Sequence, residues 1–418
     1  MKAIHSTAFL CGSFSIKNEI KSFDAKWKKV MSKEEKSVLG RYYYPEFVEF
    51  CYPEEDQEKN GMQRYSLSID KSIEINLRGK RHAIFVKDIE IFVLPYNLFI
   101  YAIRVTQDGA DLNDITLSLS ILRNISEYKD ELIKDGWGEI LEPIVEIYRS
   151  AGDVHDRPLQ HFDLMENGNK LKLFQIVEIE SSKLTEKEQD ELLFELGTLA
   201  HIDSYNGNSF TSPSQEYFDK IMKHNKISVF NNWKGLSLFD TFTVLSYPTH
   251  QYLLDNWANY YFGMIYIHSL FLKFYLFRMN ILFRKKTIRA SSLEKEFLDF
   301  EMNCCFHKIS YNFLPLEIYQ SLDIGLEINE ERKQLFRMIE QEKNIQEKEG
   351  DRKLNNILLF LTGLTVFSAI WDFTCLLNQL YPYDELLGST IGGFRIVTYI
   401  LLLLVIIIFI VNRFARAK

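Results

Sequence analysis

Two long apolar segments near the C-terminal end most constrain what this 418-residue chain can fold into. Residues 354–377 carry one charged side chain, and residues 391–412 include a run of 16 uncharged residues from Ile396 to Val411. A helix of about 20 residues spans the hydrocarbon core of a bilayer. We therefore predict two transmembrane helices, at 354–377 and 391–412, joined by a short external loop at 378–390.

The charges around these segments predict their orientation. The loop contains Asp384 and Glu385, whereas the outer flanks are basic (Arg352, Lys353, Arg413, Arg416 and Lys418). Positive residues stay on the cytoplasmic side of a membrane. We expect both termini in the cytoplasm and a cytoplasmic body attached to a membrane hairpin.

The first apolar segment carries a small and polar stripe. Asn355, Thr362, Thr365, Ala369 and Asp372 fall within an arc of about 100° on a helix. Polar groups in hydrocarbon need partners or water. One interpretation is a ring of identical hairpins whose stripes line an aqueous pore. The alternative is that both threonines bond to their own helix and that Asp372 lies among the outer headgroups.

The overall composition fits a soluble body with a membrane part. Hydrophobic residues make up 46% of the chain, and 25% of the residues are charged. The net charge of −8 argues against a general nucleic-acid-binding surface, so no direct nucleic-acid partner is expected.

The cysteines and the N-terminal residues indicate a reducing compartment. No two of the five cysteines have CxxC spacing, which excludes the usual zinc and thioredoxin motifs (Cys11, Cys51, Cys304, Cys305 and Cys375). The run MKAIHSTAFLCGSF is too brief for a signal peptide, because Gly12 and Ser13 break it. We expect the body to remain in the cytoplasm.

Residues 1–249 predict a mixed α and β domain around a central sheet. Alternating or apolar runs of strand length are RYSLSID, KSIEINL, HAIFVKDIEIFVL, NLFIYAIRV, NKLKLFQIVEIE, KISVFNN and LFDTFTVLS. Helical spacing occurs in LNDITLSLSILRNISEYKDELIK, with Asn113 as the expected N-cap, and in EKEQDELLFELGTLAH. The segment EILEPIVEIY fits a helix or a short strand.

Residues 250–353 predict a stalk of long helices. The segment HQYLLDNWANYYFGMIYIHSLFLKFYLF is apolar enough for a third membrane helix, but its polar residues favour a buried soluble helix (Asn256, Asn259, His268, Lys273 and Arg278). Further helices are expected at residues 291–312 and from Leu314 toward Gly350, the last leading directly into the first membrane segment. The expected domains are thus 1–249, 250–353 and 354–418.

Motifs for catalysis are absent from the sequence, so no enzyme activity is expected. No P-loop, GxSxG, HExxH or strand-linked GxGxxG occurs, and no metal ligand set is identified. The segment VHDRPLQHFD, with two His and two Asp, is interpreted as a polar loop. Arg78, Lys80 and Arg81 in RGKRH are candidates for phosphate contact, with an ordinary solvated hairpin turn as the alternative.

The layout of a cytoplasmic α/β domain, long helices and two C-terminal membrane helices resembles the CorA family of divalent-cation transporters and channels. That family carries a Gly-Met-Asn signature at the outer end of the first membrane helix, where this chain reads WDFTCLLNQLYPY. Without the signature, the chain is most similar to the divergent CorA-like effectors of type III CRISPR systems. The resemblance implies a homo-oligomeric ring, a pentamer or tetramer, in the bacterial inner membrane.

The function expected from this resemblance is a membrane effector channel of antiviral defence. A nucleotide second messenger, the S-adenosylmethionine–AMP conjugate, would bind the cytoplasmic domain and cause ion flux or membrane disruption. One alternative is a Mg²⁺ transporter of CorA type, with Mg²⁺ as ligand. The other is a membrane-anchored scaffold without a pore.

Overall fold

The centre of the body is a nine-stranded sheet in the order β2-β3-β4-β5-β1-β6-β9-β8-β7. The computed structural model describes residues 1–16, 23–30, 33–54, 57–124, 137–151, 170–180, 184–205, 212–248, 256–285, 290–380 and 403. Strands β6 and β9 pair in parallel, and the other described pairs are antiparallel. The strands are β1 Ala3–Ser15, β2 Lys28–Lys29, β3 Gln63–Leu77, β4 Lys80–Leu94, β5 Leu98–Thr106, β6 Lys172–Ile179, β7 Lys226–Phe230, β8 Trp233–Ser237 and β9 Thr241–Ser246.

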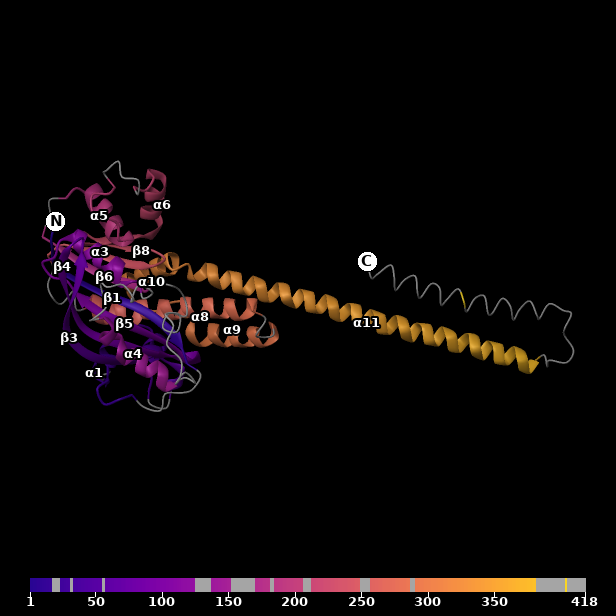
Figure 1. Cartoon of the computed structure of the whole chain (residues 1–418). Helices are drawn as coiled ribbons and strands as arrows, with labels where there is room; N and C mark the ends of the chain where they lie inside the picture. Colours follow the sequence, from indigo (N-terminus) through magenta and orange to yellow (C-terminus); the bar gives the residue numbers. More distant parts are fainter. Residues whose placement is uncertain are drawn as a thin grey trace. The chain divides into compact units, whose positions relative to one another are not determined.

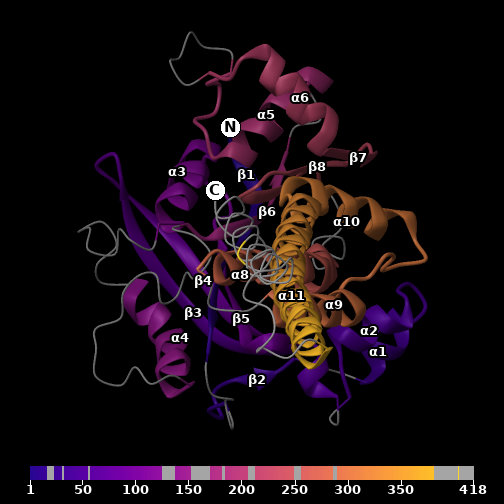
Figure 2. The same ribbon diagram turned by 90° about the vertical axis from the view of Figure 1, so that its right-hand side faces the viewer.

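Helices cover both faces of this sheet (Figures 1 and 2). The mixed α and β class expected from the sequence is confirmed. The helices are α1 Lys33–Leu39, α2 Pro45–Cys51, α3 Leu112–Leu122, α4 Trp137–Ala151, α5 Glu186–Thr198, α6 Gln215–Asn225, the π-helix η5 Trp257–Tyr266, α8 Ile267–Arg284, α9 Ala290–Cys304, α10 Phe313–Gly325 and α11 Ile328–Leu380. Single 3₁₀ turns occur at η1 Glu58–Asn60 and η2 Pro95–Asn97.

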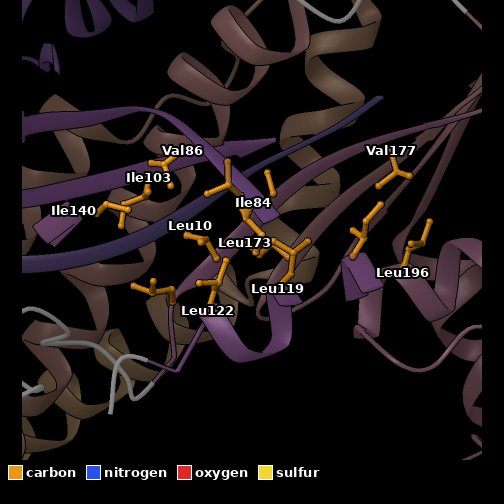
Figure 3. Packing of buried hydrophobic residues seen from close by; sticks show 14 of the residues in the cluster. Leu10, Ile84, Val86, Ile103, Leu119, Leu122, Ile140, Leu173, Val177 and Leu196 are labelled. Atoms are coloured by element: carbon orange, nitrogen blue, oxygen red, sulfur yellow. The ribbon is translucent and has the colours of Figure 1, made fainter. Parts of the chain in front are cut away.

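One face of the sheet is mainly aliphatic. Figure 3 shows Leu10 and Leu173 from the sheet beside Leu119 and Leu122 of α3, and Ile103 of β5 further along the same side of the sheet. All five side chains are almost fully buried. Burying an aliphatic side chain of this size contributes about 1.5–3 kcal/mol. This layer holds α3, α4 and α5 against the sheet.

The opposite face is aromatic, because neighbouring residues of a strand point to opposite sides. Phe9 therefore faces away from Leu10 and stacks on Phe262 of η5, with ring centroids 3.8 Å apart. Phe174 and Phe242 stack beside them at 5.1 Å. The apolar segment that contains η5 and α8 is thus buried on the sheet, as its interpretation as a soluble helix predicts.

A buried ion pair lies beneath the π-helix. The Arg64 guanidinium on β3 is 2.6 Å from the Glu90 carboxylate on β4, and both side chains are 8% exposed. Arg64 also donates to the carbonyl oxygen of Asn259 in η5. A Cβ added at Gly263 would lie 2.6 Å from Nη1 of Arg64, so a glycine at this position makes room for the pair.

Local signals explain several elements that the sequence predicts. Strands β3, β4, β5, β6, β7 and β9 form where strand patterns were expected, and α5 begins with a capping box in which Thr185 and Glu188 bond reciprocally. The ambiguous segment around Pro143 is helical in α4. The β3–β4 turn is formed by Arg78 and Gly79, both with positive φ, as two-residue hairpin turns require.

Other expectations were wrong. The N-cap of α3 is Asp111, whose carboxylate accepts from the backbone N–H of Asn113; Asn113 is not the cap. Strand β8 was not expected. Nor was β1, which is the N-terminal run judged too brief for a signal peptide and lies between β5 and β6 in the sheet. The expected helix at 291–312 ends at Cys304, and that from Leu314 is divided between α10 and α11.

The described chain forms two compact units, Met1–Arg337 and Met338–Lys418. Helix α11 includes the whole predicted first membrane segment, so that segment continues the preceding polar helix without a break. The helix ends at Leu380, which makes residues 378–380 helical and not part of the expected loop. The rest of that loop and the second membrane segment, apart from Leu403, lie outside the described residues.

The buried imidazole of His268 predicts how stability depends on pH. Burial lowers the pKa of His268 from its ordinary value of 6.5 to about 4. The unfolded chain therefore binds a proton that the folded chain does not, and the free energy of unfolding decreases as pH falls from 6.5 to about 4. We expect His268→Phe to reduce this acid-side decrease in the free energy of unfolding by up to about 3 kcal/mol. Denaturation midpoints measured between pH 6.5 and about 4 give the value.

Asp88 supplies a control of opposite sign. Burial, reinforced by Glu90, raises the pKa of Asp88 to about 6, so the folded protein binds a proton more readily than the unfolded chain as pH falls. Asp88→Asn removes this contribution and steepens the loss of stability on the acid side. A His268→Phe variant with an unchanged pH profile would contradict the assignment.

Candidate functional site

The predicted pore stripe lies on α11, which is the one helix among the described residues long and apolar enough to cross a membrane. The Thr362 hydroxyl donates to the carbonyl oxygen of Leu358 at 2.7 Å, and the Thr365 hydroxyl donates to that of Thr362 at 2.8 Å. Both hydroxyls are therefore satisfied within their own helix, as the alternative to the pore interpretation expects. This geometry is compatible with either environment, because a back-bonded hydroxyl oxygen can still accept a hydrogen bond from water.

The remaining members of the stripe have no such internal partner. Asn355, Ala369 and Asp372 are exposed on α11, and the described part of the chain offers no hydrogen bond to the amide of Asn355 or the carboxylate of Asp372. A carboxylate in or near hydrocarbon needs water, a headgroup or a neighbouring chain. These two residues carry the polar character of the stripe.

The three basic residues predicted to contact phosphate are at the tip of the β3–β4 hairpin. Arg78 is in the turn, and Lys80 and Arg81 open β4; all three are exposed. A guanidinium nitrogen of Arg81 is 3.3 Å from the carboxylate of Glu74, and both side chains are largely exposed. The structure places these residues together on a solvated turn.

A cavity of about 540 Å³ lies at the meeting point of α8, α9, α10 and the first turns of α11. Its volume falls in the range of small-molecule pockets. Leu272, Phe306, Tyr319, Ile324 and Ile328 form its apolar part, and its polar groups come from Glu301, Cys305, His307, Gln320, Asp323, Asn329 and Arg332. Every lining residue belongs to the unit Met1–Arg337.

Three helix ends bring the charged groups together. Glu301 is in the last turn of α9, Asp323 is in the last turn of α10, and Arg332 is in the second turn of α11. The helix breaks between α10 and α11 at Glu327, whose φ is 57°. This left-handed residue turns the chain, so the end of one helix and the start of the next line the same cavity.

The two carboxylates of the cavity have different partners. Arg332 Nε is 2.9 Å from a carboxylate oxygen of Glu301, which forms an ion pair across α9 and α11. Asp323 accepts a hydrogen bond from the side-chain amide of Asn329, and burial raises the pKa of its carboxyl group. Burial also raises the pKa of the Cys305 thiol, which makes this cysteine a poor nucleophile.

A buried lysine holds the start of α11 to α8. Lys273 Nζ is 3.1 Å from the Glu331 carboxylate, and the lysine side chain is only 4% exposed. The Asn280 amide, about two turns further along the same face of α8, donates to the second Glu331 oxygen at 2.7 Å. The first two turns of α11 are thus attached to α8 through Glu331 and to α9 through Arg332.

Sequence reasoning missed the cavity and the attachment of α11. The local signal available was the sequence Ile324-Gly325-Leu326-Glu327, which interrupts an otherwise helical region. Nothing in a single sequence pairs Lys273 with Glu331, because they are 58 positions apart. The segment VHDRPLQHFD lies outside the described residues, and those that are described contain no cluster of three or more His, Cys, Asp or Glu residues placed for a metal ion.

Joint replacement of Arg78, Lys80 and Arg81 by alanine tests the hairpin tip. Because these side chains are exposed and make at most a surface ion pair, the free energy of unfolding should change by less than about 1 kcal/mol. Urea denaturation gives this value, and titration of the same variant with a nucleotide measures any phosphate contact. Unchanged nucleotide affinity would rule out a phosphate-binding role for the three residues.

Replacement of Lys273 by methionine tests the attachment of α11. The change leaves the partly buried Glu331 carboxylate without its cation and should destabilise the body by about 3 kcal/mol. Lys333→Met is the matched control, because the Lys333–Glu330 pair is exposed and its loss should cost less than about 0.5 kcal/mol. Equal destabilisation of the two variants in urea would contradict the role given to Lys273.

Comparisons with models of known protein families, with curated proteins and with solved structures found no match to this chain.

Proposed function

We propose that this chain is the subunit of a ligand-gated membrane channel that assembles from several copies. The body senses a small ligand, and α11 transmits its binding to the apolar segment. The nucleotide messenger implied by the resemblance to CorA-like effectors is the ligand class proposed for the body. Release of ions through the opened membrane would be the effector activity.

The observation that carries this proposal is the continuity of α11. One unbroken helix of 53 residues provides Asn329 and Arg332 to the wall of the cavity and also contains the apolar segment. A ligand that alters the Arg332–Glu301 pair acts directly on the start of this helix. A continuous helix can transmit a rotation or a shift along its axis, whereas a flexible linker would absorb it.

Gating requires that the ligand bind the open and closed arrangements with different affinity. To convert a mostly closed channel into a mostly open one, a preference of about 10⁴-fold for the open state is needed. A cavity whose wall includes the moving helix provides such a difference, because displacement of α11 changes the wall itself. The ion pairs of Glu331 and Arg332 are the contacts that we expect to differ between the open and closed states.

The stripe on α11 supports assembly of several copies. A ring of these helices with Asn355 and Asp372 toward the axis supplies water to both side chains, which a single helix in lipid cannot do. A ring of Asp372 carboxylates attracts cations. Selectivity for cations over anions is the expected property of the pore.

Ion flux from liposomes tests the proposal. Purified full-length protein in liposomes should release trapped cations on addition of the nucleotide messenger, and Asp372→Asn should lower the preference for cations over anions. Phe367→Leu is the control, because Phe367 lies outside the stripe and keeps an apolar side chain. Flux that is unaffected by the messenger would refute gating by this ligand.

A membrane-anchored scaffold without a pore is the second candidate. It is favoured by the threonine hydroxyls, which are satisfied within α11 and need no aqueous neighbour. Replacement of residues 354–418 by an unrelated membrane anchor separates the two proposals. A scaffold retains its cellular activity after this exchange, whereas a channel loses both activity and flux.

A further inference from the structure

The cavity between α8, α9, α10 and α11 contains one carboxylate that forms no ion pair with any described residue. Arg332 is already paired with Glu301 at 2.9 Å. Asp323 forms no ion pair within the described residues, and its bond comes from the neutral amide of Asn329. The polar lining therefore holds two carboxylates, Glu301 and Asp323, against the single guanidinium of Arg332, whose charge acts on Asp323 as well.

The surroundings of Asp323 strengthen the preference for positive charge. The carboxylate is in the last turn of α10, where the helix dipole places partial negative charge. Phe306 and Tyr319 contribute aromatic surface to the same cavity, and aromatic faces attract cations. A cation that enters would meet a carboxylate, a helix C-terminus and two aromatic rings.

The size and composition of the cavity distinguish an organic cation from a metal ion. A volume of about 540 Å³ is far larger than a bare ion requires and fits a small organic molecule. Among the described residues no three His, Cys, Asp or Glu side chains are close enough to bind a metal. Leu272, Ile324 and Ile328 supply apolar wall for a methylene chain.

We propose that this cavity is a binding site for a small organic cation, whose ammonium or guanidinium group pairs with Asp323 while its hydrocarbon part lies against the apolar wall. This is the cavity through which the proposed function has a ligand act on α11, and the group that it accepts is a cation. Any effect of cation binding on ion flux rests on the proposed channel function, whereas cation binding to the cavity does not.

The site is placed to act on the corner between α10 and α11. The Asn329 amide on α11 and Asp323 on α10 are joined across the left-handed Glu327. A bound cation competes with Asn329 for the Asp323 carboxylate. Binding therefore weakens the link that joins the first turn of α11 to the end of α10.

Calorimetric titration of the full-length protein in nanodiscs tests the site. Putrescine and agmatine serve as cationic probes, and adipate, which has the same methylene chain as putrescine, serves as the anionic control. We expect binding of the two cations to one site per chain and no binding of adipate. Asp323→Asn should weaken cation binding by about tenfold or more, because a charge-assisted hydrogen bond is lost.

Two further variants make the result specific. Gln320→Trp keeps Asp323 but fills the cavity from an exposed position on α10, so it should also abolish binding. Glu317→Gln removes a carboxylate from the same helix outside the cavity and should leave affinity unchanged. Thermal denaturation shows whether each variant is folded; if Asp323→Asn is not, Gln320→Trp decides.

The outcomes separate this inference from the proposed function. Failure of both cations to bind the wild-type protein, or undiminished binding by folded Asp323→Asn or Gln320→Trp, overturns the site. Equal binding of adipate also overturns it. If cation binding depends on Asp323 but liposome flux is unchanged, the site is supported. The same result would show that the site does not act on the channel. Loss of the messenger response alone would affect only the proposed function.

Discussion

The body is organised by a sheet that must be covered on both faces. Along β1, Phe9 and Leu10 point to opposite sides, and both are buried. One side is covered by α3, α4 and α5 and the other by η5 and α8, so an apolar segment long enough to suggest a membrane helix is needed inside the body. The apolar content of a helix therefore does not show whether it lies in a membrane or in a protein core. A helix lies in the core when the fold provides an apolar surface that it can cover.

The same requirement explains where the polar groups of α8 lie. Lys273 and Asn280 are on this buried helix, and both bond to Glu331 at the start of α11. An unpaired charge at such a position would be costly, so pairing with Glu331 makes a buried lysine tolerable. The attachment of the long helix thus follows from the polar residues on α8, and the cavity lies beside it.

The sequence predicts elements whose signals are local. Alternation in β3 and β4, the apolar run of β6 and the capping box at Thr185 all act within a few residues, and they gave correct elements. Strand β1 was missed because its run of apolar and small residues has no clear period. The cavity and the ion pairs of α11 could not be predicted, since their members come from four helices and are joined only by tertiary packing. For the stripe on α11 the helix itself was predictable, whereas the neighbours of its polar residues depend on assembly.

The central position of β1 has a consequence for biosynthesis. This strand precedes both of its neighbours in the chain, since β5 and β6 end at Thr106 and Ile179. At about 5–20 residues per second, the ribosome leaves β1 without its second neighbour for several seconds or longer. The aromatic side of the sheet stays uncovered for longer still, until α8, which ends at Arg284, has been synthesised. Nascent chains of this protein therefore expose strand edges and aromatic surface during synthesis, which are the features that make partly folded chains prone to aggregate.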